Sequence, residues 1–140
     1  MIILTDQELM QVAIDEAIKG LKVGEQPFGS VIVKDDEIIS IGHNKINSSF
    51  DLTAHAEILA IKKASKEKKI IDFSGATIYA TWEPCPMCLG AIISANISRL
   101  VIAGRPENLN KKYGNYSVEN FLKLSNFSEK IEVVTGILEN

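Results

Sequence analysis

Four residues in two short motifs have the types and the spacing to build a catalytic metal site. His55 and Glu57 stand two positions apart, and Cys85 and Cys88 stand three apart further along the chain. One histidine and two cysteines supply three ligands for Zn²⁺, and these motifs contain no fourth ligand. A zinc ion with an open coordination position holds a water and lowers its pKa toward neutrality. Because Glu57 can reach that water without binding the metal, the motifs predict attack on a substrate by activated water.

Two other interpretations of these residues compete with an open zinc site. A Cys-x-x-Cys pair that follows a strand and begins a helix also fits a thioredoxin-like redox pair. That interpretation leaves His55 and Glu57 unexplained. The only other histidine, His43, could close the site as a fourth ligand of a structural zinc. An open site is favoured because His55 and Glu57 already complete it.

The three ligands fall at the starts of two expected helices. Apolar spacing predicts helices over residues 54–69 and 85–96, so His55 lies in the first turn of one helix. Cys85 and Cys88 bracket the first turn of the other helix, where residues three apart share a face. The N-terminus of a helix also favours thiolates, the form of cysteine that binds zinc.

The rest of the chain alternates helical and strand patterns. A Thr5-x-x-Glu8 capping box begins a first helix that ends near Gly24, and a last helix begins at Ser117. Strands are expected at residues 30–33, 38–41, 77–80, 100–103 and 131–134, with loops at 44–53 and 104–116. This order predicts an α/β fold, a three-layer α/β/α sandwich around a five-stranded mixed sheet. The fourth and fifth strands should be parallel because a helix connects them.

Bulk composition narrows the class of protein. With 140 residues the chain has the length of one domain, and its net charge of −3 indicates no strong attraction to nucleic acid. No apolar stretch approaches the length of a membrane span. The only two cysteines belong to the motif above, so no disulfide framework is expected. We therefore expect a cytoplasmic protein.

The motif His55-Ala56-Glu57 with Pro84-Cys85-Pro86-Met87-Cys88 resembles the signature of the cytidine-deaminase-like superfamily of zinc-dependent deaminases. The nearest branch contains guanine deaminase, cytosine deaminase and tRNA adenosine deaminase. The resemblance covers roughly residues 8–138 and implies a single deaminase domain over residues 1–140 with one Zn²⁺ per subunit. It implies hydrolytic deamination in which zinc hydroxide attacks a ring carbon and Glu57 shuttles protons until ammonia leaves. Residues 89–97 imply a homodimer or larger homo-oligomer.

The same resemblance suggests which residues bind the substrate. Asn44 stands in a Gly-x-Asn motif and should hydrogen-bond the ring, although an asparagine there could instead cap the loop. Phe28 in Pro-Phe-Gly should line the pocket, with a place in the apolar core as the alternative. Ala56 and Cys85 should contribute backbone groups. Glu83 could bind an exocyclic amine or form a structural salt bridge. The residues expected to cover the pocket, from the same or a neighbouring subunit, are Phe50, Tyr113 and Tyr116.

Three features of the sequence argue against a nucleic-acid substrate. The net charge is negative, and the chain ends soon after the fifth strand, where the tRNA deaminases continue into a further helix. The loop from Arg105 to Gly114 also departs from theirs. We therefore expect a small free cyclic amidine as substrate, such as a guanine- or cytosine-like ring. Leu52 replaces the proline usual in guanine deaminases, and their long tail is missing, which puts guanine in doubt.

Three alternatives to a small nucleobase remain open. The first is creatinine or another ring that is not a nucleobase, and the second is adenosine in tRNA, converted to inosine. The third, from another class, is a zinc-stabilised binding module without turnover. A deaminase that had lost its activity would be expected to lose Glu57, and this chain retains that residue.

Overall fold

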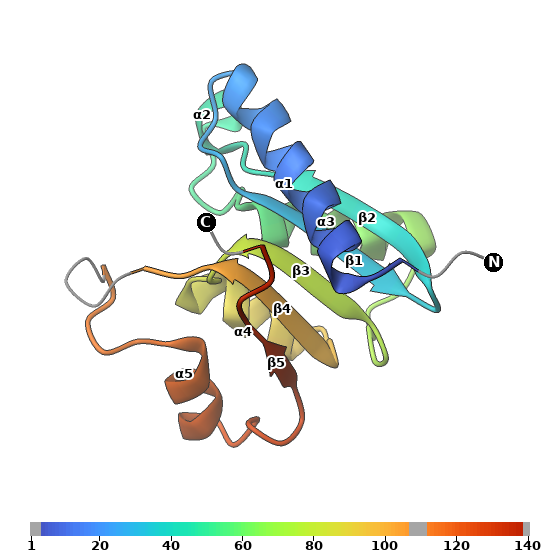
Figure 1. Ribbon diagram of the computed structural model, residues 1–140, viewed down its shortest axis with the longest axis vertical. Coiled ribbons are helices and arrows are strands. Elements are labelled where there is room, and N and C mark those ends of the chain that lie inside the picture. The colour runs from blue at the N-terminus through green and yellow to red at the C-terminus, as the bar shows by residue number, and fades with distance from the viewer. Residues whose placement is uncertain (1–3, 107–111, 139–140) are drawn as a thin grey trace.

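A five-stranded sheet with the strand order β2-β1-β3-β4-β5 forms the centre of the computed structural model, which describes residues 4–106 and 112–138 (Figure 1). Strand β1 pairs antiparallel with β2 and β3, whereas β3, β4 and β5 run parallel. The mixed sheet and the parallel fourth and fifth strands are therefore confirmed. The strands are β1 (Gly29–Lys34), β2 (Glu37–His43), β3 (Thr77–Trp82), β4 (Arg99–Gly104) and β5 (Glu132–Val134).

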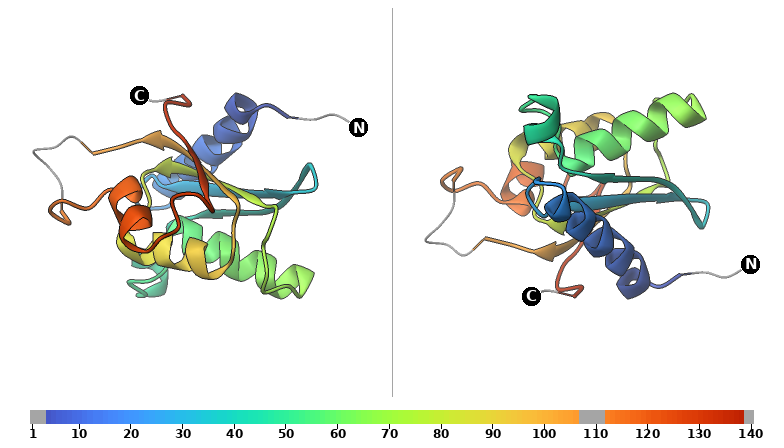
Figure 2. Two further views of the ribbon diagram at one scale, coloured as in Figure 1. Left: turned by 90° about the horizontal axis from the view of Figure 1, so that it is seen from below. Right: turned by 90° about the horizontal axis from the view of Figure 1, so that it is seen from above.

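Helices cover both faces of this sheet and make the expected three layers (Figure 2). Helix α1 (Asp6–Lys22) lies on one face, and its N-terminus has the predicted capping box between Thr5 and Glu8. The opposite face carries α3 (Ala56–Lys68) and α4 (Pro86–Ser94), with α5 (Val118–Leu124) beside α4.

The strands divide their side chains between two apolar cores, as the two-residue period of a strand requires. In β1, Val31 packs with α1, and its neighbour Ile32 packs with α3. Glycine at position 42 allows β2 and α3 to approach each other, because a Cβ atom there would lie 2.8 Å from the carbonyl oxygen of Ala56. This close approach places the start of α3, and with it His55, against the sheet.

The segment after β2 differs from the expected loop. Residues 46–49 form a short helix, α2 (Ile46–Ser49), which ends at Phe50 in the left-handed conformation with φ 50°. The residue before the helix, Lys45, makes no side-chain capping hydrogen bond. Instead, Glu25 accepts hydrogen bonds from the backbone N–H groups of Asn47 and Ser48. A partner distant in sequence therefore stabilises α2, so the local pattern gives no sign of it.

Two other expectations concern the loop after the fourth strand and membrane-spanning segments. The loop predicted over residues 104–116 includes residues 107–111, which lie outside the described residues. Within the described residues, no helix is both long and apolar enough to cross a membrane.

Candidate zinc centre and active site

The three predicted metal ligands come together where α3 and α4 begin. His55 is the N-cap residue of α3 and Cys85 is the N-cap residue of α4, and Cys88 lies one turn into α4. The Nδ1 atom of His55 is 3.6 Å from the sulfur of Cys85 and 3.3 Å from that of Cys88. All three ligand atoms lie within 4.8 Å of one another. Both N-cap residues have extended backbone, which aims their side chains back over the start of each helix.

These distances fit a tetrahedral zinc ion. Zinc–sulfur bonds of about 2.3 Å and zinc–nitrogen bonds of about 2.0 Å place nitrogen and sulfur about 3.5 Å apart at a tetrahedral angle. The measured nitrogen–sulfur separations of 3.3 and 3.6 Å bracket that value. Among residues 4–106 and 112–138, no further histidine, cysteine or acidic side chain joins these three as a fourth ligand. The set has the donor types of a catalytic site with one position left for water.

The other histidine is committed elsewhere. His43 lies at the end of β2, and its Nδ1 atom is 2.5 Å from Oε2 of Glu16 on α1. It is not part of the cluster of potential ligands. The closed site with His43 as fourth ligand is therefore excluded.

Different surroundings shift the pKa values of Cys85 and Glu57 in opposite directions. A hydrogen bond from Cys88 lowers the pKa of Cys85 to about 5, and the charge of His55 contributes to the same shift. Cys85 therefore offers a thiolate at neutral pH. Glu57 follows His55 in the first turn of α3 and is only 7% exposed. Burial raises the pKa of Glu57 to about 7, which suits a group that must both accept and donate protons.

A cavity of about 660 Å³ opens beside this cluster. Its walls include most of the residues that the sequence assigned to the substrate: Phe28, Asn44, Ala56, Glu83, Cys85, Tyr113 and Tyr116. Phe50 is the exception, because it is 94% exposed and lines a separate hollow with Leu52. Within one subunit Phe50 therefore does not cover this cavity, and only a role toward a neighbouring molecule is left to it.

Asn44 is buried at 3% exposure, and its Oδ1 atom accepts a hydrogen bond from the backbone N–H of Ile46 at 2.9 Å. Its side chain thus closes the turn between β2 and α2 and also lines the cavity. The oxygen is engaged by the turn, and the donor group of the carboxamide is its amide nitrogen.

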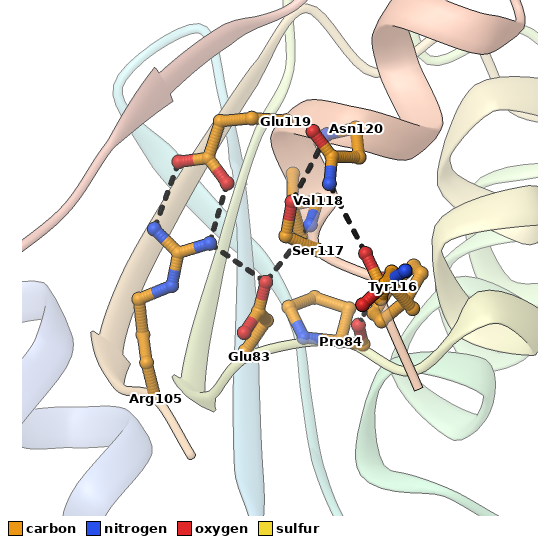
Figure 3. A network of polar contacts seen from close by, with 9 residues as sticks. Glu83, Pro84, Arg105, Tyr116, Ser117, Val118, Glu119 and Asn120 are labelled. Atoms are coloured by element: carbon orange, nitrogen blue, oxygen red, sulfur yellow. Dashed lines mark hydrogen bonds and ion pairs between the residues drawn. The ribbon is translucent and has the colours of Figure 1, made fainter. Parts of the chain in front are cut away.

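Glu83 belongs to a polar network at the edge of the cavity (Figure 3). Its Oε2 atom accepts hydrogen bonds from Arg105 at 2.7 Å and from the backbone N–H of Val118 at 2.8 Å. Arg105 also binds both carboxylate oxygens of Glu119, at 2.8 and 2.5 Å. Glu83 therefore has the salt bridge that the sequence offered as the alternative to amine binding. Because Glu83 follows β3 and Arg105 follows β4, the network joins the ends of both strands to α5.

Two tyrosines of the cavity wall, Tyr113 and Tyr116, lie close to the segment that follows β3. The hydroxyl of Tyr116 donates a hydrogen bond to the carbonyl oxygen of Pro84, next to Cys85 (Figure 3). The ring of Tyr113 meets that of Tyr116 edge to face, with centroids 6.1 Å apart. Both tyrosines therefore lie beside the metal ligands, where covering residues were expected.

Some residues of the cavity were not singled out from the sequence. Gln26 and Trp82 flank motif residues but carry no chemical signature of their own. Ile46 and Lys112 belong to no motif, and the local course of the chain places them at the cavity. The cavity residues missed in this way are Gln26, Ile46, Trp82, Arg105 and Lys112. The only signal in the sequence that could have indicated these residues is the position of a polar or aromatic residue next to a motif, as for Gln26 and Trp82.

Two cysteines, a histidine and a buried glutamate around one cavity define a zinc hydrolase that uses activated water. Residues 4–104 match the family model of the cytidine and deoxycytidylate deaminase zinc-binding region. The chain belongs to this family and is a zinc-dependent deaminase that hydrolyses C–N bonds, with His55, Cys85 and Cys88 as its zinc-binding triad. The predictions of enzyme class, cofactor and fold are confirmed.

The relatives include tRNA adenosine deaminases and guanine deaminases. The chain is 38% identical over 138 residues to the tRNA-specific adenosine deaminase of Bacillus subtilis strain 168, covering 97% of this chain and 83% of that protein. It is 43% identical over 90 residues to the guanine deaminase of the same bacterium, covering 64% of this chain and 58% of that protein. A solved structure from studies of A-to-I editing by tRNA:A34 deaminases matches with a TM-score of 0.80 and 32% identity, over 94% of this chain and 93% of that chain.

Proposed function

We propose that this protein is a tRNA adenosine deaminase, which converts adenosine to inosine in a tRNA and releases ammonia. The observation that carries the proposal is the extent of the sequence similarity. The aligned sequence of a tRNA-specific adenosine deaminase spans 97% of this chain, whereas the aligned sequence of a guanine deaminase spans 64%. We therefore rank tRNA above the small free ring that the sequence alone favoured.

The cavity supports a base that is presented on a polynucleotide. Its volume of about 660 Å³ is in the range of pockets that enclose ligands larger than a single ring. Trp82 and Tyr113 line it while remaining 42% and 45% exposed, and exposed aromatic rings are surfaces on which unpaired RNA bases stack. Lys112 also lines the cavity, with its Nζ atom 5.4 Å from the centre of the Tyr113 ring. A lysine beside an aromatic ring can bind the phosphate next to a stacked base.

The net charge of −3 is a weak argument against RNA, because charged groups far from the cavity contribute to it as much as those that line the cavity. The cavity itself is lined by two acidic residues, Glu57 and Glu83, and by two basic residues, Arg105 and Lys112. Net charge over the whole chain therefore does not describe the potential at the mouth of the cavity.

The residues of the cavity can perform the whole deamination. When bound, zinc activates the attacking water and so supplies the nucleophile. Glu57 accepts a proton as that water adds to the carbon bearing the amine, and donates it to the adjacent ring nitrogen. Glu57 then transfers the second proton to the amine, which leaves as ammonia while the ring carbonyl forms. Asn44 lines the cavity and holds the ring through its amide nitrogen.

The experiment is a comparison of kcat/KM for an adenosine-containing anticodon stem-loop, free adenosine and free guanine. We expect the stem-loop to be the best substrate. Its kcat/KM should fall steeply between about 50 and 200 mM salt, because phosphate contacts release counterions. Guanine turned over faster than the stem-loop, without salt dependence, would contradict the proposal. That result would favour guanine deaminase, the second candidate, which the 43% identity over 90 residues supports.

A further inference from the structure

Two irregular segments form adjoining walls of the cavity. The connection from α1 to β1 contributes Gln26 and Phe28, and the turn after β2 contributes Asn44 and Ile46. Neither segment is held by a continuous strand ladder, so other contacts must fix the distance between them. One such contact is the hydrogen bond from the backbone N–H of Asn44 to the carbonyl oxygen of Phe28, at 3.2 Å.

The side chain of Glu25 forms a second and stronger link between these walls. Its Oε1 atom accepts the backbone N–H of Asn47 at 2.9 Å, and its Oε2 atom accepts that of Ser48 at 2.8 Å. Glu25 is only 3% exposed, and a buried carboxylate is costly unless both oxygens are hydrogen-bonded. The backbone N–H of Glu25 donates to the carbonyl oxygen of Gly20 at 3.0 Å, which fixes this residue to the end of α1.

These contacts lead from Glu25 to the base-binding side of the cavity. By holding the N–H groups of Asn47 and Ser48, Glu25 sets the position of the first turn of α2. The preceding residue, Ile46, donates its N–H to Oδ1 of Asn44. The orientation of the Asn44 carboxamide in the cavity therefore depends on where α2 lies.

We propose that Glu25 is a positioning residue for substrate binding, which clamps α2 to the α1–β1 connection and thereby aims Asn44 and Ile46 at the substrate base. The assignment rests on the proposed function in so far as the base is the adenine of a tRNA. Glu25 contacts neither the zinc ligands nor Glu57 in any described interaction, so its effect is on the fit of the substrate and not on the chemical step.

The first test is amide hydrogen exchange in Glu25→Ala and in Glu25→Gln. We expect the amides of Asn47 and Ser48 to lose protection in Glu25→Ala and to lose part of it in Glu25→Gln, which keeps one acceptor oxygen. The matched control is Glu8→Ala. Glu8 also accepts a backbone N–H, that of Thr5, but it does so at the far end of α1. This control should leave exchange at Asn47 and Ser48 unchanged.

The second test is steady-state kinetics on the anticodon stem-loop, below the melting temperature of every variant. For Glu25→Ala we expect KM to rise about tenfold, the loss expected for one misplaced hydrogen bond to the base. We expect kcat to change less than about threefold, because the variant weakens binding of the substrate and of the transition state by the same amount. Zinc content should remain at the wild-type level. Glu25→Gln should lie between Glu25→Ala and wild type.

A purely structural role would give a different pattern. In that case Glu25→Ala would melt at a lower temperature but would keep the wild-type KM, and this result would overturn the assignment. Unchanged exchange at Asn47 and Ser48 would overturn it as well. If wild-type protein leaves the stem-loop unreacted, the proposed function fails instead. The change in KM is then measured on guanine, where the same two patterns decide the role of Glu25.

Discussion

At the residue scale, the proposed proton transfers depend on Glu57 more than on any other group that is not a metal ligand. Glu57 lines the cavity beside the zinc triad and has a pKa raised to about 7 by burial. A carboxylic acid with a pKa near the working pH can move protons in both directions during one turnover. The triad itself binds the metal without help from Glu57.

The substitution Glu57→Gln separates these two roles. We expect a fall in kcat of about 10²- to 10⁴-fold, the usual contribution of a general acid–base group, with zinc content unchanged. Ammonia release and metal analysis of the purified protein measure the two quantities. Glu67→Gln, on an exposed position of the same helix, should retain full activity. Wild-type turnover in a zinc-loaded Glu57→Gln protein would be incompatible with the proton-transfer role.

Spacing made the metal ligands predictable from the sequence, because their chemistry is encoded in residues a few positions apart. The role of Glu57 as general base stays a prediction. The contacts of Glu25 were not predictable. An acidic residue in a connection carries no local pattern, and its two partners lie 22 and 23 positions away. For Glu83 the sequence left two roles open, since the partner that decides between them, Arg105, lies 22 positions away in the segment after β4.

At the element scale, the close contact between β2 and α3 places His55. The substitution Gly42→Ala would put a methyl group 2.8 Å from the carbonyl oxygen of Ala56 and 3.1 Å from the nitrogen of Ala60. Since both atoms are helix backbone, we expect α3 to shift and the free energy of unfolding to fall by about 1–3 kcal/mol. Chemical denaturation measures this loss. In contrast, Gly90→Ala on α4 meets no atom within 4 Å and should maintain or raise stability. If Gly42→Ala were as stable as wild type, the approach of β2 to α3 would not require a glycine at this position.

The N-terminus of α1 is held to the sheet by a charged contact whose strength depends on pH. Both carboxylate oxygens of Asp6 accept hydrogen bonds from Arg99, at 2.8 and 2.7 Å, and the hydroxyl of Tyr79 donates to one of them. The hydrogen bonds from Arg99 lower the pKa of Asp6 below its ordinary value of 3.8. This contact therefore stabilises the protein fully above the unfolded-state pKa. The stabilisation disappears as pH falls through the lower folded-state pKa.

We expect Asp6→Asn to lower the free energy of unfolding by about 1 kcal/mol at neutral pH, because partial exposure screens the pair. The difference from wild type should shrink as pH is lowered from about 5 to about 2. Urea denaturation across this range measures it. Asp15→Asn, which alters an exposed acid on the same helix, should follow the wild-type pH dependence. A difference for Asp6→Asn that stayed constant with pH would disprove the charged contact.

The order of the elements followed from the sequence because apolar periodicity reports which face of a helix or strand is buried. The short helix α2 did not, since four residues are too few to show a period and its N–H groups are satisfied by Glu25. Element ends moved by one or two positions at α3 and α4, where His55 and Cys85 are N-cap residues and precede the first helical residue.

At the scale of the whole molecule, the apolar run over residues 89–97 is explained in part by the chain's own core. Leu89, Ile92 and Ile97 are at most 1% exposed. The homo-oligomer stays a prediction, and the surface available for it on α4 comprises Met87, Gly90, Ala91 and Ser94. Light scattering at micromolar concentration should give at least twice the monomer mass. A monomeric mass under those conditions would refute it.

The choice between a tRNA and a small free base as substrate depends on features of the whole molecule. The sequence favoured a small ring from the net charge and from departures in one loop. The structure shows a cavity with exposed aromatic and cationic residues in its walls. The cavity could not be deduced from spacing, because it depends on residues that the sheet brings together.

The most direct measurement is a competition in one vessel. Zinc-loaded protein is incubated with equal concentrations of guanine and an adenosine-containing anticodon stem-loop, and inosine and xanthine are quantified by mass spectrometry. A chelator-treated sample is the blank. The account predicts inosine in the stem-loop with little or no xanthine, and neither product in the blank. Xanthine formed while the stem-loop adenosine stays intact would contradict the assignment to tRNA.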